Sequence, residues 1–481
     1  MLKAIVRKEL LENILSYRFP LFFLISAVLI LSSLYVHHLD YAKRVRDYNE
    51  QIRLANEELA AARPTDLHFG RIPLRGFLPP SPLSSFAAGF ESTLPKYYEF
   101  NAEGSKPGDT AAAEESVLGV FGQLDFLFIV QMVACLIVLL FASDAIAGEK
   151  EMGTLRAMLA NSTPRHSLLL GKFLGGYAAI WLPFLVVFLL GAIVLGLLAF
   201  PLGQSGMPLR LTLIFLISSL FLLSYYALGL LVSASSARSR TALVAILLVW
   251  IGLQMAVPRL SDMIASVVLP IPTETVISMQ KSVVVKTLED EKARALGRQY
   301  ETLFGRGTLF SLEPEPASKR PEWEAFKADI EMRTAERKTT QLREIESGFQ
   351  RVKARQQALA AGLSLVSPSA AFTRLLTDLC GTGEIDRGRY LEAVRAHQQT
   401  LDTALYSHVK KTTIIMPSGG TASASSIDQM VNPKALPAFV FRRADAVDAI
   451  AGNWGGLISL VFWLIVPFAG AYVRFIKYDV R

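Results

Sequence analysis

Six long apolar runs limit what this 481-residue chain can fold into more than any other feature. A helix of about 20 apolar residues crosses the hydrocarbon core of a bilayer. A helix also satisfies its backbone hydrogen bonds within its own segment, as the bilayer interior requires. The runs cover residues 19–36, 124–142, 173–200, 209–232, 241–257 and 457–473. We therefore predict an all-α polytopic membrane protein with six transmembrane helices.

The first and last runs are short, so a buried helix of a soluble protein is an alternative for each. The first run also follows basic residues, as a cleaved signal peptide would. However, Tyr35-Val36-His37-His38 stands where a small-x-small cleavage site would be needed. We interpret this run as a retained span.

Basic residues in the short loops indicate the orientation, because such loops stay on the cytoplasmic side. Such residues precede the first run, lie between the second and third runs and between the fourth and fifth runs, and follow the sixth run. The one basic residue that does not fit this pattern is Arg210, at the edge of the turn between the third and fourth runs. The pattern predicts that both termini lie in the cytoplasm, the tail being 474–481. The net charge of +7 fits membrane anchoring. Without a basic stripe that alternates with aromatic residues, we expect no nucleic-acid partner.

Two long segments, 37–123 and 258–456, are then expected outside the membrane. From Tyr41 to Leu59, apolar residues recur at steps of three and four, which predicts an amphipathic helix. A proline-rich passage that cannot continue the helix follows. Residues 103–115 are polar and rich in Gly and Ala, and we expect a mobile loop there.

The larger external segment carries two further helical stripes. Their members are Leu342, Ile345, Phe349, Val352, Leu359 and Leu363 in one, and Tyr390, Val394, Leu401 and Leu405 in the other. We expect the two helices to bury their stripes against each other in a helical bundle, with an intermolecular coiled coil as the alternative. Residues 412–434, rich in Ser, Thr and Gly, predict a loop. Together the two insertions would form a helical extracytoplasmic domain.

A short polar motif lies between the second and third runs, within residues 143–172. It comprises Gly148-Glu149-Lys150-Glu151-Met152-Gly153-Thr154-Leu155, then Arg165, Gly171 and Lys172. It resembles the cytoplasmic coupling segment of ABC-2 type exporter permeases. The resemblance implies a subunit that is driven by a separate ATPase and has no catalysis of its own.

Under this resemblance the ATPase-coupling residues are Glu149, Glu151, Gly153, Thr154, Leu155, Arg165 and Lys172. The two acidic residues suit the positive start of a helix or basic groups on a partner. Gly153 would allow a close backbone approach, and Leu155 would fill a pocket of the partner. The alternative is a solvated interfacial helix that touches nothing.

Two further segments fit the same family. Residues 1–18 have an apolar face and resemble an interfacial elbow helix, with an ordinary basic flank as the alternative. Ser367-Pro368, Ala370-Ala371-Phe372 and Leu379-Cys380-Gly381-Thr382 resemble the external signature of a subgroup with enlarged loops after spans one and five. The same residues also predict a helix with Ser367 as its N-cap, Pro368 at its first position and Gly381 at its end.

No familiar catalytic motif appears in the sequence. Gly171-Lys172 leads into an apolar run and is no phosphate loop, and neither His-Glu-x-x-His nor Gly-x-Ser-x-Gly occurs. His37-His38 lacks a third ligand, so we expect a polar membrane boundary there and no metal site. Cys135 and Cys380 have no metal-binding spacing. The spans contain Gln131 and Gln254 but no central charge, which disfavours an ion-coupled carrier.

The resemblance implies an assembly of two permeases, identical or related, with two ABC ATPase subunits that hold the ATP and Mg²⁺. Membrane lipids surround it. The expected cargo is lipid-like, a peptide or an envelope component, and the sequence identifies no substrate-binding residue. The alternative is a mechanotransmission scaffold on which the ATPase acts to drive an extracytoplasmic partner without moving a solute. A receptor-like anchor without an ATPase is a third option.

Overall fold

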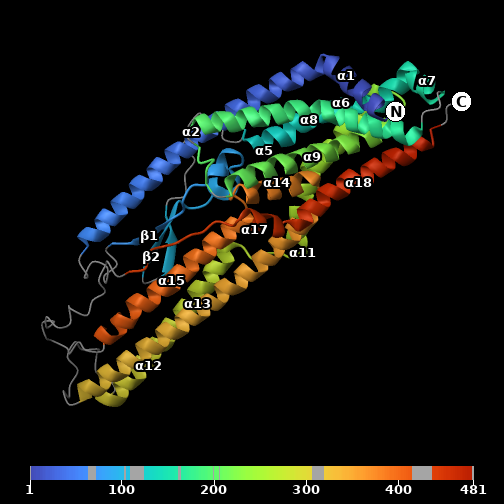
Figure 1. Cartoon of the computed structure of the whole chain (residues 1–481). Coiled ribbons are helices and arrows are strands. Elements are labelled where there is room, and N and C mark those ends of the chain that lie inside the picture. The colour runs from blue at the N-terminus through green and yellow to red at the C-terminus, as the bar shows by residue number, and fades with distance from the viewer. Residues whose placement is uncertain are drawn as a thin grey trace. The chain divides into compact units, whose positions relative to one another are not determined.

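The computed structural model describes residues 2–62, 72–101, 104–108, 124–160, 164–198, 200–204, 206–305, 319–413 and 436–478. It divides into two compact units (Figure 1). Unit 1 comprises Met1–Met255 and Leu365–Arg481, and unit 2 comprises Ala256–Ser364.

Six helices of the described chain are long and apolar enough to span a membrane, which agrees with the six apolar runs. They cover Arg18–Ala61, Phe126–Met152, Arg165–Leu197, Met207–Ser235, Ser239–Val268 and Trp454–Ile476. The first, α2, has 44 residues and continues without a break into the predicted amphipathic helix. At a rise of 1.5 Å per residue it is about 66 Å long, roughly twice the hydrocarbon thickness.

Two of the spans change their helical winding partway along. The second consists of α5 (Phe126–Phe128), the π-helical turn η3 (Ile129–Ala134) and α6 (Cys135–Met152). The fifth consists of α10 (Ser239–Ile251), the π-helical turn η4 (Gly252–Ala256) and α11 (Val257–Val268). A π-turn accommodates one extra residue in a helix and is uncommon.

The fourth span, α9 (Met207–Ser235), is the most buried of the six candidate spans. It packs against α6, α8 (Arg165–Leu197), α10, α14 (Pro368–Leu379) and α18 (Trp454–Ile476). The N-terminal helix α1 (Leu2–Leu15) precedes α2 and packs on α8. The start of α1, the end of α18 and the short helix α7 (Thr154–Ala160) lie at the same end of unit 1 (Figure 1).

The proline-rich passage forms a small antiparallel sheet, which the sequence analysis did not predict. Its strands are β1 (Leu74–Phe77), β2 (Tyr97–Asn101) and β3 (Gly104–Pro107), in the order β1-β2-β3. Leu74 pairs with Phe100, and Phe100 with Ser105. Two 3-10 turns, η1 (Pro82–Ser85) and η2 (Gly89–Ser92), join β1 to β2. The predicted loop at 103–115 is therefore a strand at Gly104–Pro107, and the rest of it lies mostly outside the described residues.

The stripe predicted on residues 390–405 is buried within unit 1, where its core partners belong to the sheet and to the segment around Phe439. In α15 (Glu384–Thr413), Tyr390, Val394 and Leu401 form a core with Phe100 of β2, and aromatic residues such as Phe439 pack against it. A spacing of three and four residues fixes which face of a helix is buried but not its partner. Leu405 lies where no side chain is described, and so do most of the predicted loop residues 412–434.

Unit 2 has its own core. The helix α12 (Glu274–Phe304) packs along α13 (Arg320–Ser364), and α11 also contacts α13. Tyr300, Leu303 and Trp323 form the buried cluster at one end of this pair. Phe349 of the predicted stripe is half-buried, with Lys353 Nζ 5.8 Å from the centre of its ring.

The helix α14 begins and ends with the residues predicted to cap it. Ser367 caps it by accepting a hydrogen bond from the Ala370 N–H, and Pro368 stands at its first position. Gly381, with φ of 70°, follows its end in the left-handed conformation that favours glycine. The short helix α17 (Ala446–Ala451) then precedes α18.

Candidate functional site

A buried ammonium group lies within the polar motif region. The Lys172 side chain on α8 is only 2% exposed. Its Nζ lies 2.6 Å from Oε1 of Glu149 on α6 and 2.9 Å from Oε1 of Glu9 on α1. Lys8 Nζ lies 4.0 Å from each of these two oxygens. Because a buried charge is stable only when it is paired, this cluster connects three helices, α1, α6 and α8. We call Glu9, Glu149 and Lys172 the coupling triad.

The helix α1 lies close enough to α8 for the triad to form. A Cβ atom built on Gly171 would lie 2.4 Å from Ile5 Cγ2, and one built on Gly175 would lie 2.8 Å from the Val6 carbonyl oxygen. Contacts below 3.0 Å are not tolerated by real side chains, so these glycines are needed for the close packing. The predicted apolar face of residues 1–18 therefore packs partly on α8.

The junction between α6 and α7 is a tight turn at Gly153. Its φ of 77° is left-handed, and within the described structure a Cβ there would meet nothing within 4 Å. The left-handed backbone conformation accounts for the glycine within this chain, and the close approach of a partner at Gly153 stays a prediction. Leu155, the next apolar residue, is fully buried inside this chain, so it does not fill a partner's pocket. Thr154 donates a hydrogen bond from Oγ1 to the Glu149 carbonyl oxygen at 3.3 Å.

The acidic pair lies in the last turn of α6, not at the start of a helix as the sequence suggested. Glu149 faces inward to the triad. Glu151 is exposed, and its Oε2 accepts a hydrogen bond from the Ser239 N–H at 3.0 Å. Lys150 lies between them and donates to the Ser236 carbonyl oxygen at 3.1 Å. These contacts attach the end of α6 to the turn between α9 and α10.

Arg165, at the start of α8, reaches the C-terminal end of the chain. It donates to the carbonyl oxygens of Ile476 and Tyr478, the latter at 3.2 Å. The ring of Tyr478 also lies 5.2 Å from Lys150 Nζ, within the range of a cation–π contact. The predicted site residues thus gather at one end of unit 1, most of them in contact with other parts of the chain. The exposed surface that remains consists of Glu151, Met152, Gly153, Thr154 and Arg156, which we call the α7 edge.

Sequence reasoning missed Glu9. The signal for it was a lone carboxylate three residues after Val6, on the face of α1 that packs on α8. Two other sequence candidates have local roles. His37 Nδ1 lies 2.9 Å from the Ser33 carbonyl oxygen, and His38 Nε2 lies 3.0 Å from that of Leu198. Among the described residues, no group of three His, Cys, Asp or Glu side chains could hold a metal ion.

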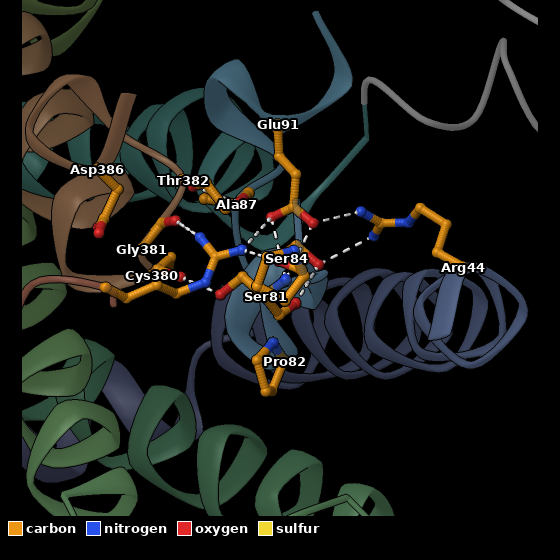
Figure 2. Close-up of polar contacts among 12 residues, drawn as sticks. Arg44, Ser81, Pro82, Ser84, Ala87, Glu91, Cys380, Gly381, Thr382 and Asp386 are labelled. Carbon is orange, nitrogen blue, oxygen red and sulfur yellow. Dashed lines mark hydrogen bonds and ion pairs between the residues drawn. The ribbon is translucent and has the colours of Figure 1, made fainter. Parts of the chain in front are cut away.

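A second polar cluster, which the sequence analysis did not predict, joins the two long insertions after the first and fifth spans. Figure 2 shows Arg44 of α2 directed at Glu91 of η2. The Arg44 guanidinium lies 2.9 Å from Glu91 Oε1 and donates to Ser84 Oγ at 2.9 Å. Arg443 lies 3.8 Å from the other Glu91 oxygen and donates to the carbonyl oxygens of Gly381 and Pro79. We call Arg44, Glu91 and Arg443 the external ion cluster.

Backbone contacts reinforce the same junction. Thr382 Oγ1 donates to the Ala87 carbonyl oxygen at 2.9 Å, and Ser81 Oγ donates to that of Cys380 at 2.6 Å (Figure 2). Burial raises the pKa of Glu91, while the two arginines and the Ser81 N–H oppose that increase. The junction therefore contains a buried carboxylate whose charged form is disfavoured by burial and favoured by two neighbouring cations.

The comparisons agree with this arrangement. A family model described as ABC-2 family transporter protein matches residues 3–480. A search of curated proteins finds no match. Permeases of the matched family are in general non-catalytic membrane subunits that work with an ABC ATPase. With six helices long enough to span a membrane and a family match over nearly its whole length, this chain belongs to the ABC-2 type transporter permeases.

Proposed function

We propose that this chain is the transmembrane half of an ATP-driven exporter and that its ATPase binds at the α7 edge. The observation that carries the proposal is the coupling triad directly beneath that edge. ATP and Mg²⁺ bind in the ATPase, two copies of which serve two permeases, identical or related. The cargo is a lipid-like, peptide or envelope substrate.

The α7 edge has the composition of a docking surface. Met152, the last residue of α6, is 70% exposed, and Arg156 of α7 is also exposed. Methionine and arginine are both enriched where proteins meet. Leu155 is buried between them and anchors α7 to the bundle, so a force on the edge reaches the bundle through a fixed contact.

The triad explains how such a force would spread. A push on α7 acts on the last turn of α6, where Glu149 is bound to Lys172 of α8, which is in turn bound to Glu9 of α1. Because separating buried charges is costly, the three helix ends move together. In this proposal Glu149, Lys172, Thr154 and Leu155 transmit the force. Glu151 and Arg165 hold the neighbouring turn and the C-terminal end in place.

The orientation follows the loop charges. Arg165 and Lys150 both contact Tyr478 near the C-terminal end of the chain, and Lys8 of α1 lies 3.9 Å from the sulfur of Met158 in α7. Short basic loops stay in the cytoplasm, so this end of unit 1 faces the cytoplasm of a bacterial inner membrane. The sheet, α15 and unit 2 then belong to the extracytoplasmic side.

The scaffold alternative is favoured by one observation, the unbroken α2. It runs from the α1 end of the bundle to Arg44 of the external ion cluster and could drive an extracytoplasmic partner directly. Native mass spectrometry of the gently solubilised complex separates the two functions. An exporter retains the ATPase together with lipid or cargo, whereas a scaffold retains the ATPase together with an extracytoplasmic protein.

The docking test introduces negative charge at the α7 edge. Arg156→Glu and Met152→Asp should each weaken co-purification of the ATPase about tenfold, the effect expected of a residue near the centre of an interface. Membrane insertion and thermal stability should not change, because both side chains are exposed. Arg294→Glu, an exposed arginine of α12, is the matched control. Full ATPase binding by both edge variants would refute the proposed docking surface.

A further inference from the structure

The N-terminal end of α14 is fastened to the two spans that contain π-turns. Ser367 Oγ donates to the Leu253 carbonyl oxygen in η4 at 2.6 Å and accepts from the Ala370 N–H at 3.4 Å. One hydroxyl group therefore caps α14 and also satisfies a backbone carbonyl of the π-turn. Irregular winding shifts the backbone hydrogen bonds of a helix, and here a side chain from another helix binds such a group.

A chain of buried polar side chains continues the connection. The Tyr225 hydroxyl on α9 lies 2.7 Å from Ser369 Oγ, which in turn donates to Gln254 Oε1 in η4. Gln254 Nε2 lies 3.6 Å from the sulfur of Met132 in η3. Tyr225, Ser369 and Gln254 are all buried. The chain thus links α9, α14 and both π-turns.

The π-turn of the second span, η3, forms a separate hydrogen bond with α14. Thr373 Oγ1, one turn after Ser369, lies 3.2 Å from Gln131 Oε1 in η3. Gln131 and Gln254 are the main polar side chains of the apolar runs, and the sequence analysis predicted no partner for either. The structure places both in π-turns and brings both to the same short helix.

The C-terminal end of α14 is fastened to the external elements. Asp378 accepts from the Ile385 N–H at the start of α15 at 3.0 Å and from Asn453 Nδ2 at 2.7 Å. Arg210, at the start of α9, donates to the Leu379 carbonyl oxygen at 2.7 Å. Between the two ends, Phe372 stacks on Phe221 of α9 at 4.3 Å. A rigid, buried helix of twelve residues therefore connects two spans with α15.

We infer that α14 is the relay through which the second and fifth spans drive α15, and that Gln131 and Gln254 are the positioning residues of two π-turn joints. The inference rests on the proposed function, which supplies the force. If a π-turn reverts to α-helical winding, the helix beyond it rotates by about 100° and shifts by about 1.5 Å. The polar bonds from η3 and η4 would pass that movement to α14. Hydrogen-bonded contacts suit this role, because they have discrete bound and broken arrangements.

The test uses the co-purified permease–ATPase complex in lipid nanodiscs. A nitroxide at Glu392→Cys, an exposed position on α15, reports movement by its spectrum with ATP and with ATP plus vanadate. Cys135 and Cys380 are both buried and leave this label specific. The variants are Gln254→Leu, Ser369→Ala and Gln131→Leu. The matched control is Ser218→Ala, a buried hydroxyl of α9 that donates to Ile214 of its own helix at 2.7 Å.

In the relay variants, the nucleotide-dependent spectral change at position 392 should fall about three- to tenfold, while the ATPase stays bound and hydrolyses ATP. Ser218→Ala should keep the full change. A relay variant that elutes as an aggregate is excluded, and the spectra of the remaining relay variants then test the inference. A wild-type change in all monodisperse relay variants would overturn the inference. So would a wild-type complex with active ATPase and an immobile α15. Loss of the ATPase from the wild-type complex would instead refute the proposed function.

Discussion

Removing the Lys172 ammonium is the sharpest test of the coupling triad. In Lys172→Met, the chain length is kept but two carboxylates, with side chains 8% and 11% exposed, lose their closest cation. Breaking a buried ion pair from one side typically costs about 3–5 kcal/mol, because the remaining charge stays buried and unpaired. Lys8, at 4.0 Å from both carboxylates, compensates only in part because it is half-exposed. We therefore expect a loss in the lower part of that range.

The measurement is thermal unfolding of the permease in nanodiscs, followed by intrinsic fluorescence. Lys172→Met should lower the midpoint clearly. The triple variant with Glu9→Met and Glu149→Met should recover most of the loss, because no buried charge then lacks a partner. Lys292→Met is the control, since its ion pair with Glu331 at 3.4 Å is largely exposed and should contribute at most about 1 kcal/mol. Equal midpoints for wild type and Lys172→Met, or a triple variant as unstable as the single one, would refute the reasoning.

Three further outcomes are expected. Burial between two aromatic rings lowers the pKa of His397, so the folded state resists protonation of this side chain. The protease resistance of the sheet–α15 core should therefore fall as the pH drops through about 6.5. The variant His397→Leu should abolish that pH dependence. Phe372→Ala, at a fully buried stacked ring, should cost about 3–5 kcal/mol in thermal unfolding, and the half-buried Phe349→Ala clearly less; equal costs would contradict the burial argument. A cysteine at Ser105 should react with an impermeant thiol reagent in intact cells, and one at Ser235 only after permeabilisation; the opposite pattern would reverse the proposed orientation.

Hydropathy and helix punctuation predicted a large part of this fold. The six apolar runs became six long helices, because a length of apolar sequence is a local property. The caps of α14 were predicted for the same reason, since Ser367, Pro368 and Gly381 act on their own neighbours. The sheet was missed, because Tyr97-Tyr98-Glu99-Phe100 is too short to give a period-two pattern among prolines.

Partners in space were much harder to predict than elements. The α15 stripe was recognised as a buried face, but its core partner is Phe100 of β2, a pairing that no spacing along the helix encodes. The same limit applied to the polar motif. Lys172 and Glu149 were singled out, but their mutual contact and the role of Glu9 depend on the crossing of α1, α6 and α8. The sequence thus singled out these residues but did not predict their contacts within the chain.

The continuity of α2 makes its helical phase a determinant of assembly. Arg44 lies on the same uninterrupted helix as the first span, so its direction around the axis is set by the residue count below it. One residue inserted near Ser33 would turn Arg44 by about 100° relative to the span and carry it away from Glu91. Seven inserted residues would return it to within about 20° of its original direction but about 10 Å further out. Insertions in this helix should therefore be tolerated only when they add whole turns. Even then, the external segments must be able to shift outward with the helix.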